Sequence, residues 1–416
     1  MKKQFELSGK TATFIVISVI AYLFSYGSIQ AQVVFPNIQV NDLDSADASP
    51  DGYKSITVID DTVYVVWTDK RNNHIPNIFF SKSIDGGQSF STDIQVYNGP
   101  DSIGHVAPSV AVDEWGVIYV AWTALSNNDQ YWNIWMAKSV DGGSSFQTPQ
   151  IITNTNSFFL PSVGLFNNNI YVFYADLAGY PYADYYFSRS VNGGASFETP
   201  VQVNDVPCVS EVSDFISAMT VDASGNIYLA WVDGRRTNSH GDICFAKSTN
   251  NGVSFSSNVI VNDISSIYAD SVQYMPSIAV GSANKVYITF TDQRLGNDDW
   301  PSNRVYLSVS DDGGSTFAPE VLLAGHDDIC KFHDITASTN DKISVAICSN
   351  VVPYGWAIWL FESFDGGINF AAPVALCDTL NNSYSDLRMF MTSDENVYAV
   401  WKDERIGMGL TNVYFS

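Results

Sequence analysis

Short apolar runs recur along the chain at a nearly constant spacing. They are rich in Val, Ile, Tyr and Trp, which favour β-strands, and polar turn residues follow each run. Seven runs predict seven strands, at 63–67, 118–122, 170–174, 227–231, 286–290, 343–347 and 397–401. The repeat length is roughly fifty to sixty residues, which leaves room for four short strands and their loops in each repeat. This is the content of one propeller blade.

A turn signature, Ser-x-Asp-x-Gly-x-x-Phe, follows six of these strands, and Asn replaces Asp in two copies. The copies span 83–90, 139–146, 190–197, 248–255, 310–317 and 363–370. We expect the Asp or Asn side chain to cap a tight turn and Gly to supply backbone angles closed to other residues. The final Phe is expected to pack between neighbouring sheets. The capping residues are Asp85, Asp141, Asn192, Asn250, Asp312 and Asp365.

The two ends of the chain explain why seven strands accompany six turns. Segment 412–416 aligns with 77–81, a third strand, and the sequence stops there. Segment 35–42 resembles 200–205 and 258–263, which are fourth strands of internal blades. We therefore predict an all-β, seven-bladed propeller of four-stranded antiparallel blades whose N-terminal strand completes the last blade.

The N-terminus has the layout of a secretory signal. Lys2, Lys3 and Lys10 precede an apolar run at 13–26, and small or polar residues follow up to Gln32. We predict a signal peptide at 1–31 and a single propeller at 32–416, secreted or held at the cell surface. The alternative is an uncleaved anchor, although the run is shorter than the roughly 20 residues of a spanning helix.

Composition limits the partners. The formal net charge is -24, so nucleic acid and anionic membranes are poor partners, and so is a highly anionic polymer unless basic residues gather locally. The five cysteines permit disulfides in an exported chain, and we expect Cys330 to pair with Cys348, with the remaining pairings among Cys208, Cys244 and Cys377 open. A closed ring of this size needs no such staple, and a monomer is expected.

Blade topology predicts where a ligand would bind. The repeated turns join strands three and four and open on one face, so we expect ligands on the opposite face and at the mouth of the central channel. Loops on that face follow two patterns. Four carry an Asp-x-Arg step, interpreted first as an ion pair that fixes the loop and second as a guanidinium ring for carboxylates or sulfates: Asp69 with Arg71, Asp233 with Arg235, Asp292 with Arg294, and Asp403 with Arg405.

The remaining loops are aromatic. Aromatic rings stack on sugar faces, and amides and carboxylates beside them bond sugar hydroxyls. Packing between blades explains the same rings equally well. The candidate ligand-binding residues are Tyr131, Trp132, Tyr180, Tyr182, Trp300, Tyr354 and Trp356, with Asn127, Asn128 and Asp129 nearby.

Two further features carry candidate chemistry. His326, Cys330 and His333 lie within eight residues, a spacing that permits a metal site but fits no well-known zinc pattern. Arg388 occupies a first-strand position that other blades fill with uncharged residues, so we expect an acidic neighbour or an anionic ligand beside it. No run of the sequence matches a calcium-binding loop, so calcium binding in the acidic loops stays an open alternative. We expect the protein to require no cofactor.

The six turns resemble the Asp boxes, or BNR repeats, of the sialidase superfamily, and the resemblance covers nearly all of 32–416. It implies a propeller, while members of this superfamily include non-sialidase glycosidases, sorting receptors and assembly factors. Working sialidases use three arginines, a Tyr activated by a Glu and an acid/base Asp on a six-bladed ring. Here the early Arg-Ile-Pro element is absent, with Phe35-Pro36-Asn37 in the nearest place. A non-sialidase member is therefore expected.

The leading hypothesis is a secreted recognition or scaffold module for a glycan or a cell-surface partner. The alternative is a sialidase-like glycoside hydrolase or a polysaccharide lyase acting at the channel mouth, and a third is a purely structural surface protein. Seven-bladed lyases use a His and Tyr pair with a neutralising Arg, and hydrolases use paired carboxylates. The candidate catalytic residues are Asp298, Asp299, Glu211 and Asp214 for a hydrolase, and His105, Tyr185 and Arg388 for a lyase.

Overall fold

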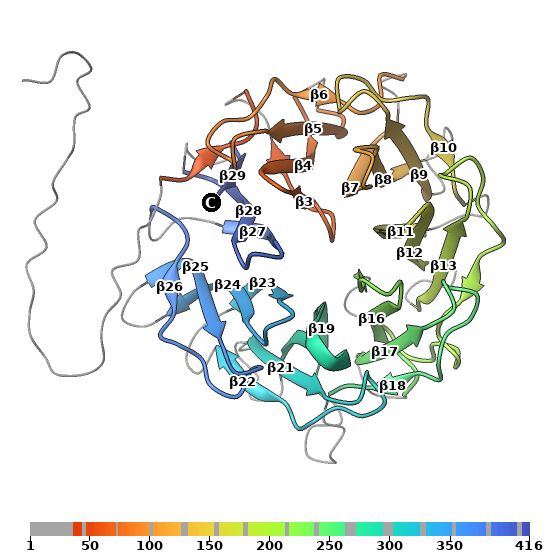
Figure 1. Ribbon diagram of the computed structural model, residues 1–416, viewed down its shortest axis with the longest axis vertical. Helices are drawn as coiled ribbons and strands as arrows, with labels where there is room; N and C mark the ends of the chain where they lie inside the picture. Colours follow the sequence, from red (N-terminus) through yellow and green to blue (C-terminus); the bar gives the residue numbers. More distant parts are fainter. Residues whose placement is uncertain are drawn as a thin grey trace, which may run out of the picture. The chain divides into compact units, whose positions relative to one another are not determined.

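Strands of high β-propensity form seven antiparallel sheets arranged as a ring in a computed structural model of the protein (Figure 1). The structure describes residues 36–43, 47–71, 74–99, 103–125, 132–153, 158–177, 182–212, 216–236, 241–262, 272–293, 303–324, 330–351, 355–379, 384–405 and 410–416. Residues 34–416 form one compact unit. The predicted all-β, seven-bladed fold is confirmed.

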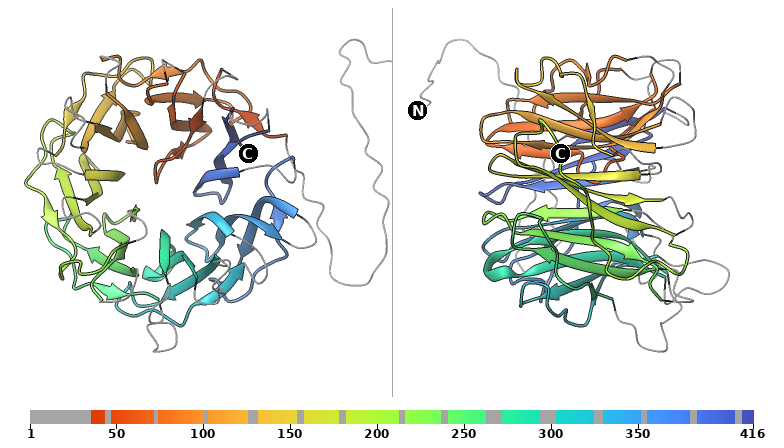
Figure 2. Two further views of the ribbon diagram at one scale, coloured as in Figure 1. Left: turned by 180° about the vertical axis from the view of Figure 1, so that it is seen from behind. Right: turned by 90° about the vertical axis from the view of Figure 1, so that its right-hand side faces the viewer.

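The first strand of each blade lies nearest the axis of the ring (Figures 1 and 2). These strands are β3 (Ile56–Ile59), β7 (His105–Val112), β11 (Phe158–Phe166), β15 (Ser217–Val221), β19 (Gln273–Val280), β23 (Cys330–Ala337) and β27 (Tyr384–Met391). The second strands are β4 (Thr62–Asp69), β8 (Ile118–Leu125), β12 (Asn169–Asp176), β16 (Ile227–Asp233), β20 (Val286–Asp292), β24 (Ile343–Val351) and β28 (Val397–Asp403). The predicted apolar runs therefore lie in the second strands.

Outer strands complete the sheets. The third strands are β5 (Asn77–Ser83), β9 (Trp132–Ser139), β13 (Asp184–Ser190), β17 (Asp242–Ser248), β21 (Arg304–Ser310), β25 (Gly355–Ser363) and β29 (Asn412–Phe415). The fourth strands are β6 (Ile94–Gln95), β10 (Gln150–Ile151), β14 (Val201–Gln202), β18 (Val259–Ile260), β22 (Val321–Ala324), β26 (Val374–Ala375) and β1 (Ile38–Gln39). Blade one also holds β2 (Ala48–Ser49), paired with β4, and a short 3-10 turn, η1 (Ser282–Asn284), follows β19.

Blade seven is assembled from both ends of the sequence. β1 pairs antiparallel with β29, with Ile38 opposite Phe415 and Gln39 opposite Tyr414. The sheet continues through β28 to β27. This arrangement leaves no break between the first and last parts of the ring.

The six turns after the third strands share one hydrogen-bond pattern. In the first, the Ser83 hydroxyl donates to Asp85 Oδ1 at 2.5 Å, and the Gly87 and Ser89 amides donate to Ser83 Oγ at 2.8 Å and to Asp85 Oδ1 at 2.9 Å. Gly86 and Gly87 have φ of 70° and 89°, a region that side chains disfavour. Asn192 accepts the same bonds through Oδ1, so Asn and Asp are interchangeable in this turn.

The Phe that ends each turn packs against the preceding blade. Phe90 meets Phe415 of β29 edge to face, with ring centroids 5.4 Å apart. The same contact joins Phe146 to Phe80, Phe255 to Phe187 and Phe317 to Phe245. The buried core therefore lies between neighbouring sheets, where aromatic pairs add to the burial of apolar surface.

Candidate functional site

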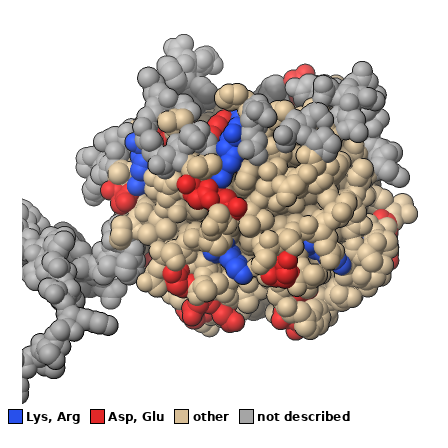
Figure 3. Space-filling model, turned by 90° about the horizontal axis from the view of Figure 1, so that it is seen from above, with Lys and Arg blue, Asp and Glu red and all other residues tan. Residues whose placement is uncertain are grey.

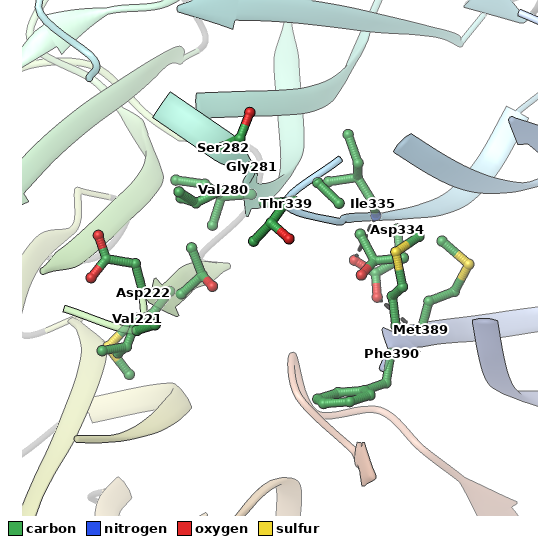
Figure 4. A pocket seen from close by; sticks show the side chains of 18 of the residues that line it. Val221, Asp222, Val280, Gly281, Ser282, Asp334, Ile335, Thr339, Met389 and Phe390 are labelled. Atoms are coloured by element: carbon green, nitrogen blue, oxygen red, sulfur yellow. Dashed lines mark hydrogen bonds between the residues drawn. The ribbon is translucent and has the colours of Figure 1, made fainter. Parts of the chain in front are cut away.

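A cavity of about 550 Å³ opens near the axis of the ring. Its wall is formed by the ends of β15, β19, β23 and β27 and by the turns that follow the first three (Figure 4). Polar and apolar side chains both line it, and they include Lys54, Thr220, Asp222, Thr336, Asp334 and Phe390. This volume lies within the usual range of small-molecule sites.

The cavity opens on an unexpected face. Turns between strands one and two lie at the same ends of an antiparallel sheet as turns between strands three and four. The cavity is lined by turns of the first kind, at Asp222–Ser224 and at η1. It therefore belongs to the face that carries the repeated turns, whereas the sequence predicts ligands on the opposite face and at the mouth of the central channel.

The segment 50–55 enters the centre of the ring from blade one. The Ser55 hydroxyl donates to the carbonyl oxygens of Pro50 and Gly52, which holds the segment in a tight loop. A Cβ atom at Gly52 would lie 1.6 Å from the carbonyl oxygen of Pro108, so only glycine fits there. Tyr53 and Lys54 of this loop reach the cavity wall.

Tyr53 joins blade one to blade five. Its hydroxyl accepts the amide of Ile278 at 3.1 Å and lies 3.3 Å from Ser277 Oγ. Burial, with a smaller effect of the nearby Asp334 carboxylate, raises the pKa of Tyr53 well above its usual value. The phenol therefore stays protonated at neutral pH and is not an activated nucleophile.

This contact compensates for a gap in a ring of side chains on the first strands. In blades two and five the ring residue accepts an amide from the next blade, as Ser109 does from Val163 at 3.0 Å and Ser277 from Ile335 at 3.3 Å. Blade four has Ala218 at this position, which offers no oxygen. The hydroxyl of Tyr53 takes its place for the amide of Ile278.

Asp334 and Arg388 occupy the same ring position in blades six and seven. Both are only 7% exposed. Asp334 accepts the Ser277 hydroxyl and the amides of Ile335 and Met389, the last at 2.7 Å. Burial raises the pKa of Asp334, while the Arg388 charge and these donors act in the opposite direction. The predicted acidic neighbour of Arg388 is thus Asp334, which sequence analysis overlooked.

Arg388 makes further contacts within the protein. Its Nε and Nη1 donate to the carbonyl oxygens of Gly52 and Leu387, each at 2.6 Å, and its guanidinium lies 6.0 Å from the ring centre of Tyr53. These contacts fix the loop at 50–55. An anionic ligand is not needed to explain the position of Arg388.

Lys54 differs from these residues. It is half-buried beside the cavity, and burial lowers the pKa of its ammonium to about 8. Among the described residues no carboxylate lies within ion-pair distance of its Nζ. Its carbonyl oxygen accepts the amide of Val110 at 2.8 Å, which fixes its backbone.

The Asp-x-Arg steps form clamps between outer strands. Arg71 donates to Asp69 at 2.5 Å, to Asp93 before β6 at 2.7 Å, and to Asp42 after β1 at 3.0 Å. The clamp therefore joins the fourth strands of two neighbouring blades. Arg235 with Asp233, Asp205 and Asn258, and Arg405 with Asp403, Asp378 and Asn37, repeat it. The Asp-x-Arg step is therefore an ion pair that fixes the loop in these three blades, as predicted. Its arginines do not form a ring around the channel, so the alternative interpretation as a ligand site is wrong. Arg294 lies outside the described residues.

Charged side chains of both signs also lie on the surface of the ring (Figure 3). On the side of the ring shown in Figure 3, basic and acidic side chains are scattered among uncharged ones. Lys82, Lys138 and Arg189, which precede the repeated turns, donate to backbone carbonyls of the next turn, at Gly142, Gly193 and Asn251. These three basic residues thus contribute contacts between blades.

His105 and Tyr185, the candidate lyase pair, lie in separate parts of the core. His105 is 1% exposed and contacts Tyr97, Trp122 and Trp135. Trp122 Nε1 donates to His105 Nδ1 at 2.9 Å, because Ala124 stands where the clamps of other blades supply an Asp to the Trp. Burial lowers the pKa of His105 to about 4.

Tyr185 is fully buried against Phe173 and Trp231. It shares no wall with the cavity. The structure therefore gives neither His105 nor Tyr185 access to a substrate, and the assignment of these two as a catalytic pair is wrong.

The remaining predicted site residues are dispersed. Glu211 is exposed, while Asp214, Asp298 and Asp299 lie outside the described residues. Trp132 packs edge to face on Phe159 at 5.8 Å, Trp356 lies against the core of blade six, and Tyr182 is 42% exposed. Tyr131, Tyr180, Trp300 and Tyr354 also lie outside the described residues. The aromatic loop site therefore stays a prediction.

The predicted metal set is only partly described. His326 lies outside the described residues, and within them no three potential ligands cluster. His333 is buried, its Nδ1 lies 3.1 Å from Thr289 Oγ1, and burial lowers its pKa to about 3. Calcium in the acidic loops stays a prediction.

The predicted disulfide between Cys330 and Cys348 is wrong. A bulge in β23 places Cys330 opposite Ser349 and Phe332 opposite Cys348, so the two sulfurs are not on directly paired residues. The Cys348 thiol donates to the carbonyl oxygen of Tyr384 instead. No disulfide links the five cysteines, all of which lie in described parts of the chain.

Comparison with known proteins supports the fold. No family model matches the chain, and no curated protein matches it. An ulvan lyase of polysaccharide lyase family PL25 is similar with a TM-score of 0.62 and 11% identity, covering 92% of this chain and 94% of that one. The polysaccharide lyase Uly1 gives a TM-score of 0.55 at 9% identity, covering 88% and 89%.

An α-L-arabinanase from Penicillium chrysogenum, complexed with arabinobiose, gives a TM-score of 0.50 at 12% identity, covering 75% of this chain and 93% of that one. Sialidases are also among the similar structures. At these identities the likeness extends to the fold alone. In the described part of the chain, no helix is long and apolar enough to cross a membrane.

Proposed function

We propose that the protein is a secreted carbohydrate-recognition propeller and that its ligand binds in the central cavity. The observation that carries the proposal is the cavity itself: about 550 Å³, lined by hydroxyl-bearing side chains such as Thr220, Thr336 and Ser282 together with Phe390. Hydroxyl groups bond sugar hydroxyls, and an aromatic ring packs on a sugar face. The similar propellers whose names include polysaccharide lyase and arabinanase agree with a carbohydrate ligand.

The hydrogen bonds of the cavity carboxylates favour binding of a ligand over its chemical conversion. The carboxylates at the cavity are already engaged: Asp334 accepts three donors, and Asp222 accepts the amides of Ser224 and Asn226 and the hydroxyl of Tyr228. Neither is available as a base without breaking these bonds. A protein ligand at the cell surface is the alternative partner.

The test is to fill the cavity. Thr220→Trp places an indole in the cavity, and Asn98→Trp places one in a separate peripheral cavity of about 460 Å³ as a matched control. Retention on a panel of neutral and acidic oligosaccharides should be lost in Thr220→Trp and kept in Asn98→Trp. Released product from the unmodified protein would instead indicate an enzyme. Equal retention by both variants would place the site elsewhere.

A further inference from the structure

Lys54 is the charged group at the cavity with hydrogen-bonding capacity to spare. Its ammonium has three donors, and within the described ranges it has no ion-pair partner. Three hydrogen bonds fix the loop that carries Lys54. Arg388 donates to the Gly52 carbonyl oxygen, the Ile278 amide donates to the Tyr53 hydroxyl, and the Val110 amide donates to the Lys54 carbonyl oxygen. Such a fixed backbone reduces the entropy that a ligand contact would cost.

The nearby carboxylates, Asp334 and Asp222, are hydrogen-bonded to groups other than the Lys54 ammonium. Asp334 lies beside Arg388, and its oxygens accept a hydroxyl and two amides. Asp222 is held by the turn after β15, including its bond with Asn226 Nδ2 at 2.8 Å. Half-burial also makes a charged ligand group more valuable here than at the open surface.

We propose that the cavity selects a sugar carrying a single acidic group, a carboxylate or a sulfate, with Lys54 as its partner. The overall net charge of -24 repels long polyanions, so the fit is to a short oligosaccharide or a terminal residue. This selection rests on the proposed carbohydrate site in the same cavity.

The experiment compares a glucuronic acid-containing disaccharide with its neutral glucose counterpart by calorimetric titration. The unmodified protein should bind the acidic sugar at least about tenfold more tightly, a difference that added salt reduces. Lys54→Met should remove this preference, so that the acidic and the neutral sugar bind with similar affinity, and Lys54→Arg should retain much of it. Unchanged melting of both variants establishes that they fold.

Failure of the two proposals can be told apart. If both sugars bind equally and Lys54→Met changes neither, but Thr220→Trp abolishes both, the carbohydrate site stands and the role of Lys54 is overturned. If neither sugar binds and the neutral panel is also blank, the carbohydrate site itself is overturned. A sulfated disaccharide in place of the uronic one distinguishes the two sources of the anion.

Discussion

The outer turns and the centre of the ring use different means to hold neighbouring blades together. In the outer turns, the same Ser, Asp or Asn, Gly and Phe contacts recur, and a basic residue of one blade bonds the turn of the next. Near the axis, the contacts vary, because the ring position on the first strand holds Ser109, Ala218, Asp334 or Arg388 in different blades. Repeated contacts therefore stabilise the ring, and the departures from repetition shape the cavity.

The largest expected effect lies at the centre. Asp334→Ala leaves the Met389 amide without its acceptor and leaves Arg388 without its acidic neighbour. It also leaves the Ile335 amide and the Ser277 hydroxyl with only their longer contacts, to Ser277 Oγ and to the Tyr53 hydroxyl, each at 3.3 Å. Each unsatisfied buried donor costs about 1–3 kcal/mol, so the free energy of unfolding should fall by about 3 kcal/mol or more. Denaturant unfolding measures it. Asp312→Ala, in an exposed outer turn, is the control and should cost less; an equal loss would remove the distinction between centre and rim.

The next effect separates two glycines of one outer turn. Gly86 and Gly87 both have positive φ, but a Cβ atom meets nothing within 4 Å at Gly86 and lies 1.9 Å from Phe415 Cε1 at Gly87. Gly86→Ala should cost roughly 1–2 kcal/mol for the backbone. Gly87→Ala should cost about 1–3 kcal/mol more because it overpacks the contact between blades. Similar unfolding midpoints for the two variants would contradict the role of this turn in joining blades.

A smaller effect concerns pH and the buried imidazole of His105. Its pKa is about 4 in the folded protein against 6.5 for an ordinary His, so the folded state keeps it neutral while the unfolded state takes up a proton. The contribution of neutral His105 to the free energy of unfolding is complete above pH 6.5 and is lost as the pH falls toward 4. Between pH 6.5 and 5 the loss is at most about 2 kcal/mol.

His105→Gln retains an acceptor for Trp122 and removes the titration. Thermal unfolding from pH 7 to 5 should therefore show a shallower decline in this variant than in the unmodified protein. His333, whose pKa is also lowered by burial, remains in both proteins and contributes equally. Parallel pH profiles for the two proteins would mean that His105 titrates normally.

The smallest effect is expected at the exposed carboxylate of an outer turn. Its hydrogen bonds with Ser83 and Ser89 hold the pKa of Asp85 at about 2. Asn192 and Asn250 accept equivalent bonds in their own turns. Asp85→Asn should leave the melting temperature nearly unchanged, whereas Asp85→Ala should lower it. A marked drop for the Asn variant would show that the charge itself matters there.

The fold was predictable because its determinants are local and repeated. Seven apolar runs and six turns, each with its own Gly and Phe, specify strands and blade boundaries without any long-range information. The clamps were predictable for the same reason, although their partners Asp42, Asp93 and Asp205 come from other strands.

The central site was not predictable in the same way. Lys54 and Tyr53 lie in a short loop without a motif, and their importance arises only because the ring brings them to β19, β23 and β27. His105 attracted a catalytic interpretation by residue type alone, because seven-bladed lyases use a His and Tyr pair and no motif places His105 beside Tyr185. A signal was available: Asp334 falls at the ring position of Ser277, and aligning the first strands would have paired it with Arg388.

The pairing of β1 with β29 also sets the order in which the protein can be completed during synthesis. β1 leaves the ribosome among the first strands, and its partner β29 is translated after all the other strands. Until then the first blade lacks its neighbour, and the Phe90 ring has no Phe415 to pack on. A nascent chain thus exposes one apolar blade surface until the last strand arrives, and exposed surface of this kind favours aggregation.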